Sequence, residues 1–151
     1  MAAAELPDAL ADVLTGIQRL IRRRLRAGMP APRLRGAQIE LLRLVVADPG
    51  IRVSAAAKEL YLAGNSVSTL VNQLVRAGLL RRETDPADRR STRLLPTPDA
   101  EARLRDWAER RTALVRQQVE RLSEEDRAAV AAAIPALRRL AEGLHEEVVG
   151  R

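Results

Sequence analysis

The chain has 151 residues, of which 26 are Lys or Arg and 20 are Asp or Glu, so its formal net charge is +6. This length allows one domain, or one domain with an extension, and the positive charge favours an anionic partner such as nucleic acid or a membrane surface. The chain has no cysteine and one histidine, His145, which excludes disulfides and a thiolate nucleophile and argues against a metal site or a histidine-based triad. We therefore expect no enzyme activity, no cofactor and no metal.

The sequence also bears on membranes and export. No apolar run approaches the roughly 18 residues that a membrane-spanning helix requires. The first eight residues lack the charged-then-apolar order of a signal peptide. We expect a cytoplasmic protein with no membrane partner.

The first predicted element is an amphipathic helix at residues 8–26, whose C-terminal half is rich in arginine. Such a helix can bind a membrane, but packing against another helix is the commoner use. One glycine and two prolines at 28–32 should end it. Helical spacing resumes at 37–46, and residues 51–53 could supply a short third strand beside a later hairpin.

A helix-turn-helix is predicted next, with helices at 55–61 and 64–77. Ser54 is the expected N-cap of the first helix, and Ser54 and Arg52 should be placed to touch phosphate. Gly78 should close the second helix as its C-terminal glycine.

The second of these helices has an unusual polar face. Its apolar stripe is opposed by short, uncharged side chains and one arginine, where a solvated face would carry Glu and Lys. Amide and hydroxyl groups suit the reading of base edges in a DNA major groove, and Asn or Gln can pair with adenine through two hydrogen bonds. The alternative is a polar helix with no special duty. The candidate DNA contacts are Asn65, Ser66, Ser68, Thr69, Asn72, Gln73 and Arg76.

Two short runs, 79–84 and 92–95, flank a turn that begins with Asp-Pro, which predicts a β-hairpin with Arg89 and Arg90 at its tip. A helix-turn-helix followed by a basic hairpin is a winged helix, and an arginine of its wing can enter the minor groove. The alternative is a solvated loop whose arginines pair with Asp85 and Asp88. Both can hold, because a carboxylate can position an arginine for phosphate.

Two further helices complete the fold, which is mainly α with a small β-hairpin wing. Thr97-Pro98 should start a helix to Leu122, and Ser123 should cap a last helix that contains Pro135. These helices and the first one carry apolar stripes that one small winged helix has no room to bury. We therefore expect a homodimer that binds double-stranded DNA at palindromic sites. The expected organisation is an N-terminal dimerisation helix and linker at 1–33, a winged helix-turn-helix DNA-binding domain at 34–97, and C-terminal dimerisation helices at 98–151, in one compact chain.

Residues 34–100 resemble the MarR family (multiple antibiotic resistance regulators), winged helix-turn-helix repressors that act as dimers. The resemblance rests on Val67–Leu74, Gly78–Leu80, Asp85–Arg90 and Thr97-Pro98. In the wing, Asp88 and Arg90 occupy the family's Asp-x-Arg positions, which implies that Arg90 enters the minor groove and that Asp88 braces it. Asn72 and Thr69 stand where the family commonly has Asp and Arg, which implies an unusual base preference. The outer helices match in length and amphipathicity only.

The resemblance also implies a small, often aromatic, anionic effector bound between the dimer helices and the winged helix. Trp107 and Arg111 are the side chains expected at such a site, with simple packing as the alternative for Trp107. The sequence thus predicts a dimeric transcriptional regulator, a repressor released by a ligand. The alternatives are the same regulator without a ligand response and a winged helix that binds protein. Protein-binding winged helices tend to lose the basic wing, which this sequence keeps.

Overall fold

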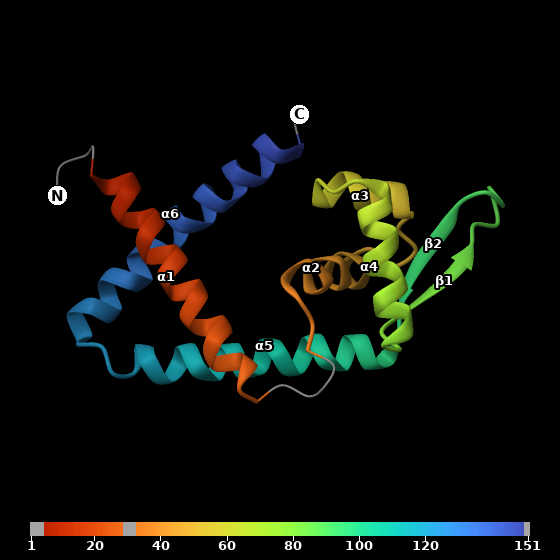
Figure 1. Cartoon of the computed structure of the whole chain (residues 1–151). Coiled ribbons are helices and arrows are strands. Elements are labelled where there is room, and N and C mark those ends of the chain that lie inside the picture. The colour runs from red at the N-terminus through yellow and green to blue at the C-terminus, as the bar shows by residue number, and fades with distance from the viewer. Residues whose placement is uncertain (1–4, 29–32, 150–151) are drawn as a thin grey trace. The chain divides into compact units, whose positions relative to one another are not determined.

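The computed structural model of the chain describes residues 5–28 and 33–149. The described part contains six helices and one antiparallel hairpin (Figure 1), so the fold is mainly α with a β wing, as the sequence predicts. The helices are α1 (Leu6–Arg26), α2 (Gly36–Ala47), α3 (Val53–Leu60), α4 (Gly64–Arg76), α5 (Pro98–Val119) and α6 (Glu124–Val149), and the strands are β1 (Leu80–Thr84) and β2 (Thr92–Pro96). The predicted break at 28–32 lies outside the described residues except for Gly28.

The chain divides into two compact units between Arg111 and Thr112. The first contains α1 to β2 and the start of α5, and the second contains the end of α5 and α6. Within the described helices, none is both long and apolar enough to cross a membrane.

The hydrophobic core belongs to the winged helix. Apart from Leu25 of α1, every buried hydrophobic side chain of the described residues lies between Leu41 and Ala100. Aliphatic side chains from α2, α3, α4 and the hairpin fill this core without an aromatic residue, as expected of a chain with two aromatics. The fully buried members of largest volume are Leu41, Leu42, Leu74, Leu94, Val45, Val67 and Val71.

The hairpin is short and regular. Five residue pairs join β1 and β2, from Leu80 opposite Pro96 to Thr84 opposite Thr92. The predicted third strand is reduced to one isolated bridge between Arg52 and Arg93. Beside it, the N–H of Gly50 donates to the carbonyl of Leu94 at 2.8 Å and the N–H of Leu94 donates to the carbonyl of Ile51 at 2.9 Å. This bridge ties the start of α3 to the wing.

The same bridge corrects the predicted start of α3. Ser54 is not the N-cap, because α3 begins at Val53 and Arg52 is the capping residue. The backbone of Arg52 is extended by its pairing with Arg93, and its carbonyl accepts the first helical hydrogen bond, from Ala56 at 2.9 Å. Ser54 therefore lies in the first turn. The helix ends at Leu60 rather than at the predicted Tyr61, which is its C-cap, adopts φ +53° and is exposed.

The other predicted helix ends agree with the structure. Gly78 has φ +73° and follows α4, and the N–H of Leu79 donates to the carbonyl of Leu74 at 2.9 Å, which satisfies the end of the helix. Thr97 accepts the N–H of Ala100 at 3.3 Å, and Ser123 accepts the N–H of Asp126 at 3.0 Å. The largest difference is at the end of α5, which ends at Val119 rather than at Leu122, and the bounds of α1, α2 and α4 differ from the predicted ones by one or two residues.

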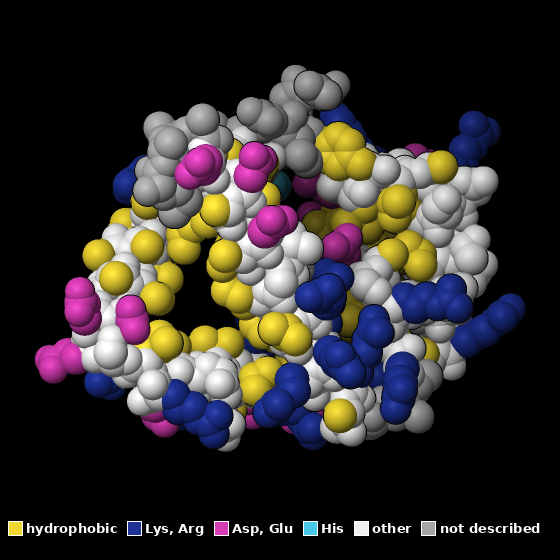
Figure 2. Space-filling model, turned by 60° about the vertical axis from the view of Figure 1, so that its left-hand side comes forward, with side chains coloured by type: hydrophobic (Ala, Val, Ile, Leu, Met, Phe, Trp, Pro, Cys, Tyr) yellow, Lys and Arg dark blue, Asp and Glu magenta, His cyan; other side chains and the backbone are white. Residues whose placement is uncertain are grey.

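The outer helices keep much of their apolar surface open. On α1, Leu6, Val13, Leu14, Ile17 and Leu20 are 43–55% exposed. On α6, which continues through Pro135, the exposed hydrophobic side chains are Val130, Ile134, Leu140 and Leu144. Figure 2 shows hydrophobic side chains at the molecular surface, with Lys and Arg side chains gathered toward the lower right of the view.

Candidate nucleic-acid interface

The predicted reading face of α4 is exposed in the structure. Val67, Val71 and Leu74 are fully buried, so the opposite side of the helix faces outward. Every predicted contact residue on this helix lies on the open side: Asn65, Ser66, Ser68, Thr69, Asn72, Gln73 and Arg76 are all exposed.

Several of these side chains already have partners within the protein. Thr69 donates its hydroxyl to the carbonyl of Asn65 at 3.0 Å, and the Asn65 side-chain oxygen accepts the N–H of Ser66 at 2.9 Å. Asn72 accepts a hydrogen bond from the guanidinium of Arg82, on β1. The polar face is therefore ordered by its own hydrogen bonds as well as by the helix.

Gln73 is held from the other side, by α2. Its side-chain oxygen accepts from Nε2 of Gln38 at 2.8 Å, and Oε1 of Gln38 accepts the N–H of Arg35 at 2.7 Å. The first turn of α2 is thereby connected to the reading helix. The sequence gives no local signal for this contact, because Gln38 and Gln73 are 35 residues apart.

The wing is built on a buried carboxylate, Asp85, whose exposure is 0%. It accepts hydrogen bonds from the Arg52 guanidinium at 2.6 and 2.9 Å and from the N–H of Ala87 at 3.0 Å, and it forms an ion pair with Arg93 at 3.0 Å. The Ala87 N–H, followed by the two arginines, lowers the pKa of Asp85 to about 2, although burial opposes the shift. Asp85 thus stays charged and fixes the base of the hairpin turn.

This arrangement changes the interpretation of three residues. Arg52 was expected at phosphate, but in the structure it holds Asp85 while its side chain remains 46% exposed. Asp85 pairs with Arg52 and Arg93, not with the arginines of the wing tip. Arg93 carries no sequence signal of its own, since its place beside Arg52 depends on the bridge between α3 and β2.

At the wing tip, Arg89 and Arg90 are exposed. The Asp88 carboxylate accepts the backbone N–H of Arg90 at 3.0 Å, and the Asp88 carbonyl accepts the N–H of Ser91 at 2.9 Å. Asp88 therefore shapes the turn that presents Arg90, through the backbone of Arg90 rather than through a bond to its guanidinium.

One groove brings the helix-turn-helix and the wing together. Ser54 from α3, Ser68 from α4, and Arg82 and Arg90 from the hairpin all line it. Arg82 was missed among the predicted contacts. Period-two spacing puts Arg82 on the same strand face as the buried Leu80, which predicts a packed position rather than a DNA contact.

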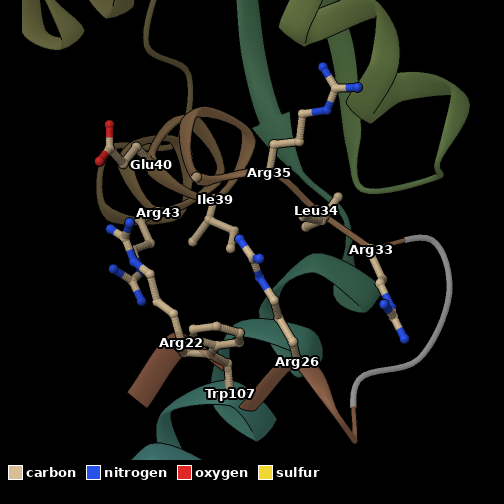
Figure 3. Close-up of a pocket in the computed structure, with 10 residues that line it drawn as sticks. Arg22, Arg26, Arg33, Leu34, Arg35, Ile39, Glu40, Arg43 and Trp107 are labelled. Carbon is tan, nitrogen blue, oxygen red and sulfur yellow. The ribbon is translucent and has the colours of Figure 1, made fainter. Parts of the chain in front are cut away.

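A second cavity, of about 400 Å³, lies between α1, α2 and α5 (Figure 3). It is strongly basic, with five arginines and a single acidic residue, Glu40. Its lining residues are Arg22, Arg26, Arg33, Leu34, Arg35, Gly36, Ile39, Glu40, Arg43 and Trp107. In Figure 3 the guanidinium groups of Arg22 and Arg43 lie beside one another, with Trp107 below them.

Only one of the two residues predicted at the effector site lines this cavity. Trp107 lines the cavity, whereas Arg111 is not among the lining residues. Arg111 acts on the cavity by its charge: burial first, and then the positive charges of Arg111 and Arg22, lower the pKa of Arg43, while Glu40 opposes them. The cavity arginines were missed because they come from two separate segments of the chain, residues 22–26 and 33–43.

Comparison with known proteins agrees with this geometry. A sequence model of the MarR family matches residues 33–91, the segment that holds the helix-turn-helix and the wing. Over this segment the chain is similar to the MarR family. No curated protein matches the chain. The chain is similar to the transcriptional regulator Tm0710 from Thermotoga maritima, with 25% identity, a TM-score of 0.67, and coverage of 89% of this chain and 95% of that one.

Two further structures were solved with bound partners. The PcaV transcriptional regulator from Streptomyces coelicolor, in complex with its natural ligand, shares 25% identity at a TM-score of 0.60, over 94% of this chain and 98% of that one. FabT from Streptococcus pneumoniae, in complex with DNA, shares 22% identity at a TM-score of 0.72, over 95% of this chain and 99% of that one. The FabT likeness establishes the shared fold. Together with the family match, these structures show that the chain has the winged helix fold of MarR-family transcriptional regulators.

Proposed function

We propose that the chain is a homodimeric repressor that binds a palindromic operator, with α4 in the major groove and the wing in the adjacent minor groove. The observation that carries the proposal is the groove in which Ser54, Ser68 and Arg90 converge from α3, α4 and the hairpin. Hydroxyl groups and an arginine at one surface suit phosphate and base-edge contacts together. FabT, which shares this fold, was solved with DNA.

The start of α3 and the wing would supply phosphate contacts. Ser54 lies in the first turn of α3, where free N–H groups and the helix dipole favour an anion. Arg52 retains an exposed part of its side chain while it holds Asp85, and Arg76 and Arg89 are exposed. Each phosphate that a dimer neutralises contributes about −0.9 to the slope of log K against log salt.

The exposed apolar side chains of α1 and α6 support the dimer. A second copy of the chain would cover them, and two-fold symmetry would place two reading helices about one helical turn of DNA apart. In this proposal the segments 1–33 and 98–151 serve dimerisation, and 34–97 binds DNA.

The basic cavity supports an anionic effector. Its five arginines would neutralise a carboxylate or a similar group, and the Trp107 ring offers a flat apolar surface for an aromatic part. PcaV, a structural relative, was solved with its natural ligand. The cavity reaches Arg35 and Gly36 at the start of α2, and the hydrogen bonds from Arg35 through Gln38 lead to Gln73 on α4. A ligand that moves this turn of α2 would disturb the reading helix.

The test is selection of binding sites from a random duplex library with the purified full-length protein at two salt concentrations. We expect one inverted repeat to be enriched and its binding to weaken steeply with salt. Salt-sensitive binding without an enriched sequence would contradict sequence-specific regulation and leave a general DNA binder.

Two variants then test the placement of the site on the selected operator. Arg90→Ala should lower affinity and relax any A·T preference under the wing, while Asn72→Ala should blur the preference at one base pair per half-site, by about 1–3 kcal/mol. Arg81→Ala is the matched control, because Arg81 is an exposed arginine of the same hairpin that pairs with Glu83. An unaltered preferred sequence in Asn72→Ala would show that this face of α4 does not read DNA.

A further inference from the structure

The contact between Arg82 and Asn72 joins the wing to the reading helix. Arg82 lies on β1 and donates to the side-chain oxygen of Asn72 on α4, and both residues are exposed. Arg82 also lines the groove with Ser68 and Arg90. The main chain of Arg82 is anchored opposite Leu94, which is fully buried, so the strand holds the guanidinium at this place.

The chemistry of the two groups fixes the orientation of the Asn72 amide. A guanidinium has only donors, so the amide oxygen must face Arg82 and the NH2 group must point elsewhere. Bidentate recognition of adenine needs the opposite use of that oxygen, because it must accept from the adenine amino group while the NH2 donates to N7. With Arg82 in place, the adenine amino group would meet a cationic donor beside the oxygen that it needs.

Guanine lacks this conflict. Its N7 and O6 in the major groove are both acceptors, and they match the NH2 group of Asn72 and the remaining N–H groups of Arg82. The positive charge of Arg82 adds attraction for the same edge, because hydrogen bonds from charged donors are the stronger ones.

We propose that Arg82 and Asn72 form one reading unit that selects guanine at one position of each operator half-site, and that Arg82 sets this specificity. The proposal rests on the proposed DNA-binding function and makes it more specific. It replaces the adenine contact that an isolated asparagine would make.

The test measures base preference at the position under Asn72. The position is located first, as the one whose preference changes in Asn72→Ala. Full-length protein then competes for operator duplexes that differ there by G·C or A·T. We expect the wild type to favour guanine by about 5- to 150-fold, and Arg82→Ala to lose this preference or shift it toward adenine.

Two further variants separate this effect from damage to the wing. Arg81→Ala removes an equal charge from the same strand, at a residue paired with Glu83, and should keep the guanine preference. Asn72→Asp keeps an acceptor for Arg82, so the wing stays attached to α4, but it removes the NH2 donors; its guanine preference should fall at least fivefold. Thermal unfolding of each variant checks that the fold is intact.

The outcomes distinguish this inference from the function on which it rests. Failure of the wild type to enrich any sequence would overturn the proposed function itself. An enriched operator that carries adenine at this position would overturn the reading unit alone. A guanine preference that survives in Arg82→Ala, or stays undiminished in Asn72→Asp, would also overturn it.

Discussion

The winged helix and the outer helices use the same aliphatic residues in opposite ways. Leu41, Leu42 and Val45 of α2 are fully buried within one chain, whereas Val13, Leu14 and Ile17 of α1 stay about half exposed. Both sets follow helical spacing in the sequence. Periodicity therefore shows which face of a helix is apolar, but it does not show whether that face is covered by the same chain or by a second one.

The largest effect should come from a cavity in the winged helix. Leu42→Ala removes a fully buried side chain from the core, and we expect the free energy of unfolding to fall by about 2–5 kcal/mol. Urea denaturation at two protein concentrations measures it. The loss should be equal at both concentrations, because the core lies within one chain. A loss below about 1 kcal/mol would contradict the close packing of α2 against its neighbours.

The next effect should come from the open face of α1. Ile17 is 51% exposed, so Ile17→Glu should leave the winged helix folded but place a charge in the proposed dimer interface. We expect the dimer dissociation constant to rise about 100-fold, or about 3 kcal/mol, by analytical ultracentrifugation. Gln18→Glu adds the same charge at the neighbouring residue and is the control. Equal dimerisation of Ile17→Glu and wild type would place the dimer interface elsewhere.

The sequence predicted a structural feature correctly when the residues that determine it lie close together along the chain. Gly78, Thr97 and Ser123 end or begin helices as predicted, because each acts on residues within a few positions. Ser54 failed as an N-cap because the start of α3 is set by a bridge to Arg93, 41 residues after Arg52 (93 − 52).

The candidate DNA interface and the cavity show the same difference between local features and contacts made by distant residues. Helical spacing on α4 placed the exposed polar face correctly, and the turn residues placed the wing tip. The partners of these residues were not predictable from spacing. Arg82 reaches Asn72, Gln38 reaches Gln73, and the cavity arginines meet only because α1 and the segment that contains α2 lie side by side. Local patterns in the sequence show which face of a helix is polar. Tertiary packing determines which polar groups on that face already have a partner within the protein.

A smaller effect should appear as a pH dependence of the wing. The pKa of Asp85 is lowered to about 2 from an ordinary value of 3.8, so its charged form stabilises the fold above about pH 4. This contribution is lost as the pH falls from about 4 to about 2. Asp85→Asn should lower the melting temperature above pH 4, and the difference from wild type should shrink below it. Asp12→Asn, on an exposed position of α1, is the control. A difference that stays constant from pH 6 to pH 2 would contradict the charged brace.

The smallest effect tests the cavity in which α1 meets the winged helix. Burial, Arg111 and Arg22 disfavour the charge of Arg43, and a bound anion would relieve this repulsion between cations. Benzoate is a suitable probe because it combines a carboxylate with a ring for Trp107. We expect it to raise the melting temperature of the wild type, and Arg43→Gln to weaken benzoate binding about tenfold, the loss of one charge-assisted hydrogen bond. Arg24→Gln removes an exposed arginine of α1 that does not line the cavity, and it should bind benzoate as the wild type does. Equal weakening of benzoate binding in both variants would mean that the general positive charge of α1 attracts the anion. Benzoate would then not bind in the cavity between α1 and the winged helix.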